Sequence, residues 1–70
     1  MFYVGLPDSQ DQICWLAGYK SDPTRYYTFE CAIKFKSAAA AQSGVIRAMK
    51  THPFQKREYI IFTEMDRIAN

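Results

Sequence analysis

Hydrophobic and polar positions alternate most regularly between Arg25 and Lys36. Polar residues fill most of the intervening positions, and the apolar ones are Tyr27, Phe29, Cys31, Ile33 and Phe35. A period of two is typical of a strand with one buried face and one face in water. The pattern therefore predicts a long strand over residues 25–36.

Three other segments have strand character. Phe2–Gly5 is short and ends in a turn-rich stretch, whereas Gln12–Lys20 is longer and more apolar. The third, Arg57–Met65, contains four consecutive residues that are apolar on both faces, as expected for a strand with a neighbour or a partner on each side. Ser21–Thr24 contains a proline and an aspartate and predicts the turn of a hairpin.

A helix is predicted over about residues 38–51. Ser37 precedes four alanines and is suited to cap the first turn. Small and apolar residues then recur at spacings of three and four, and Pro53 stops the pattern. Gly44 inside this helix costs roughly 1 kcal/mol relative to alanine, a cost that close approach of another backbone would offset.

The resulting order is β-β-β-α-β, and the fold class is α+β. We expect one domain over residues 1–70, a small antiparallel or mixed sheet of about four strands with one helix packed on one face. A single helix covers only one face of such a sheet. The other face is then left to solvent, to a second copy of the chain or to a partner.

The register of the predicted hairpin decides which side chains line that second face. A loop of even length, with Lys20 opposite Arg25, places Trp15, Tyr19 and Tyr26 there. A loop of odd length turns Trp15 and Tyr19 inward and gives a fully packed core. The Asp-Pro pair in the middle of a four-residue loop is ordinary turn chemistry and favours the even loop.

In the even register, Trp, Tyr and Arg side chains gather on one surface, and these residue types dominate binding hot spots in protein interfaces. The competing interpretation is that the aromatic residues pack beneath the N-terminal strand as ordinary core. Lysines of the long strand would steer a partner by charge. The candidate partner-binding residues are Trp15, Tyr19, Arg25, Tyr26, Lys34 and Lys36.

Composition narrows the class of protein. The chain has 70 residues, of which 49% are hydrophobic, and a net charge of +2, so it is too apolar for a disordered tail and too short for two domains. Six of its nine cations lie between Cys31 and Arg57, where no acidic residue occurs. The helix dipole accounts for those near the helix end. The others would suit phosphates or an acidic protein surface.

Several classes are disfavoured. No apolar run approaches the roughly 20 residues of a membrane helix, and the N-terminal residues do not resemble a signal peptide. We therefore expect a cytoplasmic protein in which Cys14 and Cys31 are free thiols. One histidine, two isolated cysteines and no phosphate-binding or nucleophile motif predict a non-catalytic protein without a metal or another cofactor.

In its brevity, its single domain and its lack of a catalytic motif, the chain is similar to the small accessory proteins that phages encode to block host machinery, including anti-CRISPR inhibitors. This resemblance covers no motif and carries over no residue. The first hypothesis is an inhibitor or modulator that docks on a larger host protein or ribonucleoprotein complex. The alternative is a single-stranded nucleic-acid-binding protein that uses sheet aromatics and lysines. A homodimer through the aromatic face is compatible with the first hypothesis.

Overall fold

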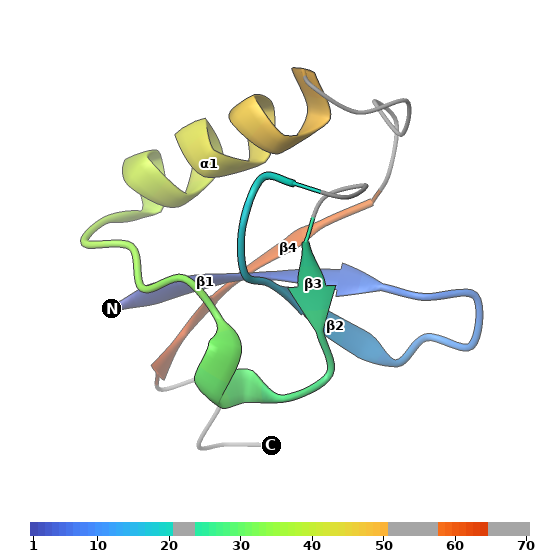
Figure 1. The fold of residues 1–70 in the computed structure, drawn as a ribbon. Coiled ribbons are helices and arrows are strands. Elements are labelled where there is room, and N and C mark those ends of the chain that lie inside the picture. The colour runs from blue at the N-terminus through green and yellow to red at the C-terminus, as the bar shows by residue number, and fades with distance from the viewer. Residues whose placement is uncertain (21–23, 51–57, 65–70) are drawn as a thin grey trace.

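The computed structural model describes residues 1–20, 24–50 and 58–64. Its four strands form one antiparallel sheet in the order β3-β2-β1-β4, and α1 packs on one face of it (Figure 1). This confirms the expected α+β class and the β-β-β-α-β order. The elements are β1 (Phe2–Pro7), β2 (Ile13–Leu16), β3 (Arg25–Tyr26), η1 (Phe29–Cys31, a 3₁₀-helix), α1 (Ala38–Lys50) and β4 (Ile60–Thr63).

The centre of the sheet is β1, the strand with the weakest sequence signal. It pairs with β2 on one side and with β4 on the other. Val4 is fully buried towards α1, and Tyr3, on the opposite face, is only 2% exposed. A strand with neighbours at both edges and cover on both faces has few positions left for polar residues, so it lacks the alternation that marks a strand in sequence.

The first turn lies later than the turn-rich stretch after Gly5 suggests, because β1 continues to Pro7. The carboxylate of Asp8 accepts hydrogen bonds from the backbone N–H groups of Gln10 and Gln12, at 2.8 and 2.9 Å. Asp11 adopts a left-handed conformation with φ of 64°. A turn followed by one left-handed residue is a common hairpin connection, and aspartate tolerates that conformation better than most residues.

The long strand predicted over residues 25–36 is wrong. Only Arg25–Tyr26 pairs with β2, and the chain then forms η1. Phe29 packs on the face of the sheet away from α1, whereas Ile33 and Phe35 pack into the core beneath α1. Of the alternating apolar residues, Tyr27 and Cys31 are exposed, and the three others are partly buried against different parts of the protein. Period-two patterning does not distinguish this arrangement from a strand.

Residues 32–37 connect the two sides of the sheet, from η1 on one side to α1 on the other (Figure 1). The N–H of Ile33 donates to the carbonyl oxygen of Leu16 at 2.9 Å. Phe35 and Phe2 exchange two backbone hydrogen bonds, of 2.7 and 2.9 Å. This segment therefore occupies the place beside β1 that β2 leaves after Leu16.

The predicted helix is confirmed. The hydroxyl of Ser37 accepts a hydrogen bond from the N–H of Ala40 at 3.0 Å, as the predicted cap requires. The buried face of α1 consists of Ala41, Gly44, Val45 and Ala48. The predicted stop at Pro53 and most of the predicted turn at Ser21–Thr24 lie outside the described residues.

Candidate functional site

One row of paired residues crosses the face of the sheet that points away from α1, here called the outer face. Tyr26 on β3 lies opposite Trp15 on β2, Trp15 lies opposite Gly5 on β1, and Gly5 lies opposite Ile60 on β4. Residues paired across neighbouring strands project to the same face of a sheet. The topology therefore brings these side chains together from three different strands.

Aromatic rings pack against each other on this face. The ring of Phe29 lies 4.5 Å from that of Tyr3 and 4.9 Å from that of Trp15, measured between centroids. Trp15 also meets Phe62 edge to face at 5.1 Å. A Cβ atom on Gly5 would lie 2.6 Å from the ring of Phe62, so glycine is what allows that ring to approach the sheet.

The expectation of an open second face is therefore only partly correct. Phe29, carried by η1, covers Tyr3 and part of Trp15, so the chain itself supplies a second small core. Beyond that cover, Tyr26 is 52% exposed and Ile60 is 44% exposed. Ile13, Trp15 and Phe62, which lie beside them, are half-buried. We call this surface the outer patch; its residues are Ile13, Trp15, Tyr26, Ile60 and Phe62.

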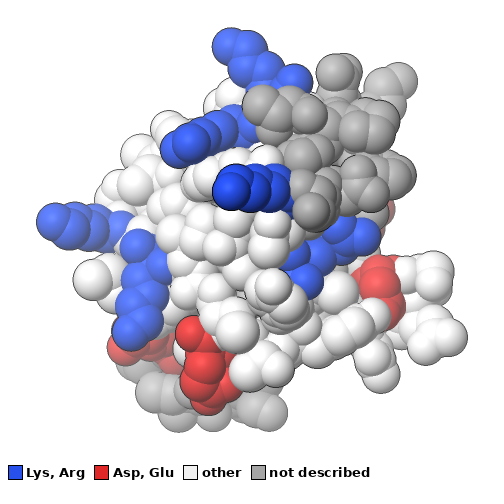
Figure 2. Space-filling model, viewed as in Figure 1, with Lys and Arg blue, Asp and Glu red and all other residues white. Residues whose placement is uncertain are grey.

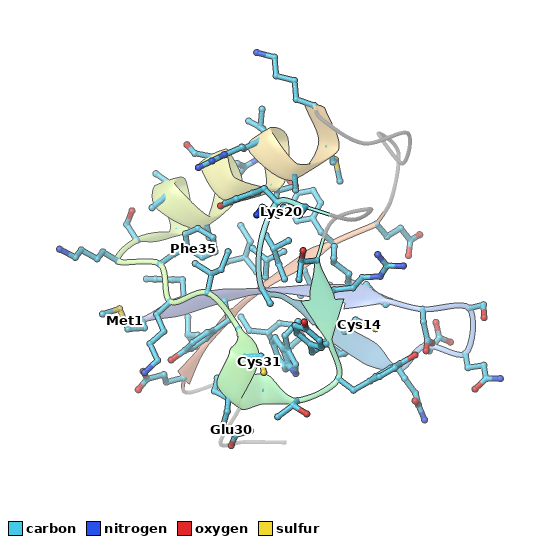
Figure 3. The ribbon with its side chains drawn as sticks, in the orientation of Figure 1. Met1, Cys14, Lys20, Glu30, Cys31 and Phe35 are labelled. Carbon is cyan, nitrogen blue, oxygen red and sulfur yellow. The ribbon has the colours of Figure 1, made fainter. Side chains whose placement is uncertain are left out.

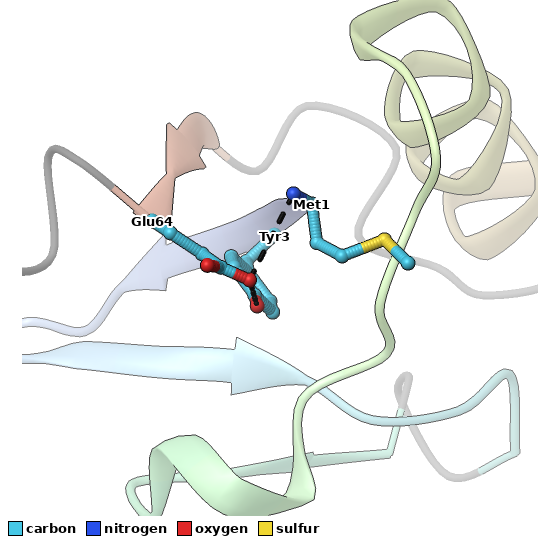
Figure 4. Close-up of polar contacts among 3 residues, drawn as sticks. All are labelled: Met1, Tyr3 and Glu64. Atoms are coloured by element: carbon cyan, nitrogen blue, oxygen red, sulfur yellow. Dashed lines mark hydrogen bonds and ion pairs between the residues drawn. The ribbon is translucent and has the colours of Figure 1, made fainter.

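A carboxylate marks the margin of the outer face. The hydroxyl of Tyr3 donates a hydrogen bond of 2.8 Å to Oε1 of Glu64, and the terminal amine of Met1 lies 3.8 Å from the same oxygen (Figure 4). Glu64 follows β4 and is exposed. Glu30 on η1 projects on the side of the sheet opposite α1 (Figure 3). The described margin of the outer face thus carries acidic groups.

The even hairpin register predicted the correct faces for Trp15 and Tyr26 but the wrong pairing. Tyr26 lies opposite Trp15 instead of Tyr19, and Leu16 lies opposite Arg25. Strand β2 ends at Leu16, so the connection between β2 and β3 is longer than the four residues assumed from turn chemistry. It remains even in length, which is why the two aromatic residues still share the outer face.

The placement of Tyr19 on the same surface is wrong. Its ring packs against the core on the helix side, and the guanidinium of Arg47 stacks over it at 4.1 Å. Its hydroxyl oxygen lies 3.0 Å from where a Cβ of Gly44 would be. Tyr19 follows β2, so the strand alternation that fixes Trp15 no longer governs its direction.

The predicted cations do not surround the aromatic residues. Arg25 shares the helix-side face with Leu16, its pairing partner. Lys34 and Lys36 are exposed on the segment between η1 and α1. Of the six candidate residues, the structure therefore brings Trp15 and Tyr26 together on the outer face. Figure 2 shows Lys and Arg gathered mainly over the part that holds α1, with Asp and Glu along the lower and right margins.

Sequence reasoning missed five residues of the second small core and the outer patch. Alternation predicts Phe29 as a residue of a long strand, and Tyr3, Ile13, Ile60 and Phe62 are not among the residues predicted for the site. Gly5 was the available signal, because glycine inside a strand often marks the close approach of another group. That signal gives the position of the approach without identifying the ring that makes it.

Tyr27 and Asp8 form a polar pair. Asp8 directly follows β1, and Tyr27 directly follows β3. The hydroxyl of Tyr27 donates to Oδ2 of Asp8 at 2.7 Å. This bond, followed by the backbone N–H of Gln12, lowers the pKa of Asp8 below its usual 3.8. The same bond to Asp8, followed by one to the thiol of Cys14, raises the pKa of Tyr27 to about 12. Tyr27 is therefore a neutral hydrogen-bond donor to Asp8 at physiological pH.

Other chemistry-bearing groups are scattered. Both cysteines are free, as expected, with Cys14 buried and Cys31 exposed on η1. Over residues 1–20, 24–50 and 58–64, no three His, Cys, Asp or Glu side chains lie close enough to hold a metal ion. The same residues include no helix with the length and apolarity needed to cross a membrane.

Comparison with known proteins identifies no relative: no family model matches the chain, and neither a curated protein nor a solved structure matches it.

Proposed function

We propose that this protein is a small non-catalytic binding module that docks on a larger protein or complex through the outer patch. The observation that carries this proposal is the row from Tyr26 through Trp15 to Ile60, which leaves a tyrosine and an isoleucine about half exposed beside a tryptophan. Aromatic side chains on a fixed scaffold bury a large area on binding and lose little conformational entropy.

The rigidity of the patch supports this proposal. Trp15 is held between Phe29 and Phe62, so its position is set before any partner arrives. A preorganised anchor avoids part of the entropy cost of association. An inhibitor or modulator needs no catalytic group, and its action follows from occupying a surface of its target. Blockade of a host defence complex, as by phage accessory proteins, is the specific form we propose.

The test is a capture experiment with immobilised protein and extract from the native host, quantified by mass spectrometry. Tyr26→Ala removes an exposed anchor without opening the core, and Ile46→Ala is the matched control because Ile46 is 59% exposed on α1. We expect Tyr26→Ala to deplete a partner by about tenfold or more, the effect of losing a hot-spot residue, and Ile46→Ala to retain it.

Circular dichroism of each variant establishes that the fold is intact. Equal capture by the wild type, Tyr26→Ala and Ile60→Ala would remove the assigned role of the outer patch. Light scattering at two protein concentrations tests whether the same face also forms a homodimer. A dimer that dissociates on Tyr26→Ala would identify a second copy of the chain as its occupant.

A further inference from the structure

Four lysines share the part of the molecule that the outer patch does not use. Lys20, Lys34, Lys36 and Lys50 are all exposed, and within the described residues none of them forms an ion pair. The chain carries no acidic residue between Cys31 and Arg57. Figure 2 shows this concentration of positive charge over α1 and the segment leading into it. We call these four residues the lysine surface.

Ordered backbone holds these lysines. Lys34 and Lys36 flank Phe35, whose backbone N–H and carbonyl oxygen both form hydrogen bonds with the backbone of Phe2. The hydroxyl of Thr24 donates to the carbonyl oxygen of Lys20 at 2.5 Å, and Lys20 lies close to α1 (Figure 3). The helix dipole explains a cation at Lys50, but it explains none of the other three.

The described residues offer few large apolar anchors beside the lysine surface. The large exposed hydrophobic side chains are Met1, Tyr26, Tyr27, Ile46 and Ile60, of which Ile46 alone lies on α1. Exposed lysines alone add little affinity for a protein, because each pair is solvated and screened. A nucleic-acid backbone differs, since neutralising its phosphates releases condensed counterions and this release drives binding.

Over residues 1–20, 24–50 and 58–64, the aromatic rings nearest to the lysine surface are partly covered. Arg47 covers one face of the Tyr19 ring, and the ring of Phe35 lies against Gly44 of α1. Single-strand binders combine cations with aromatic rings on which bases stack, and here Trp15, Tyr26 and Phe62 belong to the outer patch. A binder that has lysines without rings can use the phosphates alone.

We infer that the lysine surface binds the phosphate backbone of a double-stranded nucleic acid without reading its sequence. This inference is independent of the outer patch. Because the two surfaces share no residue, one molecule can contact a protein and a nucleic acid at the same time. A nucleoprotein complex is the partner that would engage both.

The test is the fluorescence anisotropy of a labelled DNA duplex of about 20 base pairs, titrated with protein at about 50 and about 150 mM salt. Four phosphate contacts predict about 50-fold weaker binding at the higher salt concentration. Lys34→Gln with Lys36→Gln should reduce that ratio to about sevenfold, because two contacts remain. The control is Gln10→Glu with Thr28→Glu, which lowers the net charge equally at exposed positions remote from the lysine surface. It should keep the wild-type ratio.

Four outcomes would overturn the inference. They are absence of duplex binding at the lower salt, an unchanged salt ratio in the double lysine variant, tighter binding of a single strand that depends on Trp15, and binding of a polyglutamate peptide in preference to DNA. The last would assign the lysine surface to an acidic protein. Tyr26→Ala should leave duplex binding unchanged, so failure here and failure of the outer patch are distinguishable.

Discussion

Gly44 lies in the buried face of α1 at a position where alanine would ordinarily be the better helix former. The reason for glycine is the ring of Phe35, whose Cζ and Cε1 atoms would lie 2.6 and 2.7 Å from an added Cβ. Phe35 cannot move away easily, because its backbone is hydrogen-bonded to Phe2. A side chain, not the expected neighbouring backbone, makes the close approach.

Gly44→Ala should therefore destabilise the protein, although it improves helix propensity. Overpacking against Phe35 costs about 1–3 kcal/mol, and the gain in propensity is about 1 kcal/mol, so we expect a net loss of about 1 kcal/mol. Urea denaturation measures it. Ser43→Ala, one residue earlier on the exposed side of α1, is the control and should be neutral or slightly stabilising. A more stable Gly44→Ala variant would contradict the packing seen here.

The pair of Tyr27 and Asp8 predicts a pH dependence with two windows. The lowered pKa of Asp8 gives a stabilisation present above 3.8 that is lost as the pH falls through its folded-state value. The raised pKa of Tyr27 gives one present below 10.0 that is lost as the pH rises towards about 12. Ultraviolet titration of tyrosinate, taken as a difference from Tyr27→Phe, should show ionisation near 12. Asp8→Asn should return it towards 10.0, and an unchanged titration would exclude the bond.

At the scale of elements, η1 forms a second layer. It occupies part of a predicted strand, and it places Phe29 over Tyr3 and Trp15 on the face that α1 does not reach. The connection from η1 to α1 then crosses to the other side of the sheet (Figure 1). One continuous segment thus contributes side chains to both faces, and among the described residues it leaves the outer patch exposed.

Phe29→Ala should open the outer face. We expect a loss of stability of about 2 kcal/mol, less than the 3–5 kcal/mol of a fully buried phenylalanine because this ring is half-buried. Emission of Trp15, the sole tryptophan, should shift to the red as water reaches the indole. Glu30→Ala on the same element is the control, with an expected change below about 0.5 kcal/mol. Unchanged emission from Phe29→Ala would show that Phe29 does not cover Trp15.

At the scale of the molecule, the protein has two different surfaces. The outer face carries half-exposed aromatic and aliphatic residues, with Glu30 and Glu64 at its margin, and the exposed lysines lie outside the outer patch. A domain of 70 residues has an unfolding free energy of roughly 4–10 kcal/mol. Trp15 contributes both to that stability and to the outer patch. Tyr26 is exposed, so its substitution tests binding through the outer patch with little effect on stability.

Local signals in the sequence determined several features by themselves. The serine cap, the alanines and the spacing of small residues specified α1, and alternation combined with an even-length connection placed Trp15 and Tyr26 on the same face. These features depend on residues a few positions apart, so they can be inferred before the tertiary structure is known. The α+β class follows from the order of such elements.

Tertiary structure decided the rest. Several features depend on which distant segments meet. They are the inner position of β1 in the sheet, the pairing of β2 with β3, which differs from the predicted one by four residues, the direction of Tyr19 towards α1, and η1 in place of part of a predicted strand. A period of two records that one side of the chain is buried, but not which part of the protein buries it. For the same reason, sequence alone grouped Trp15 and Tyr26 with Arg25, which the fold places on the other side of the sheet.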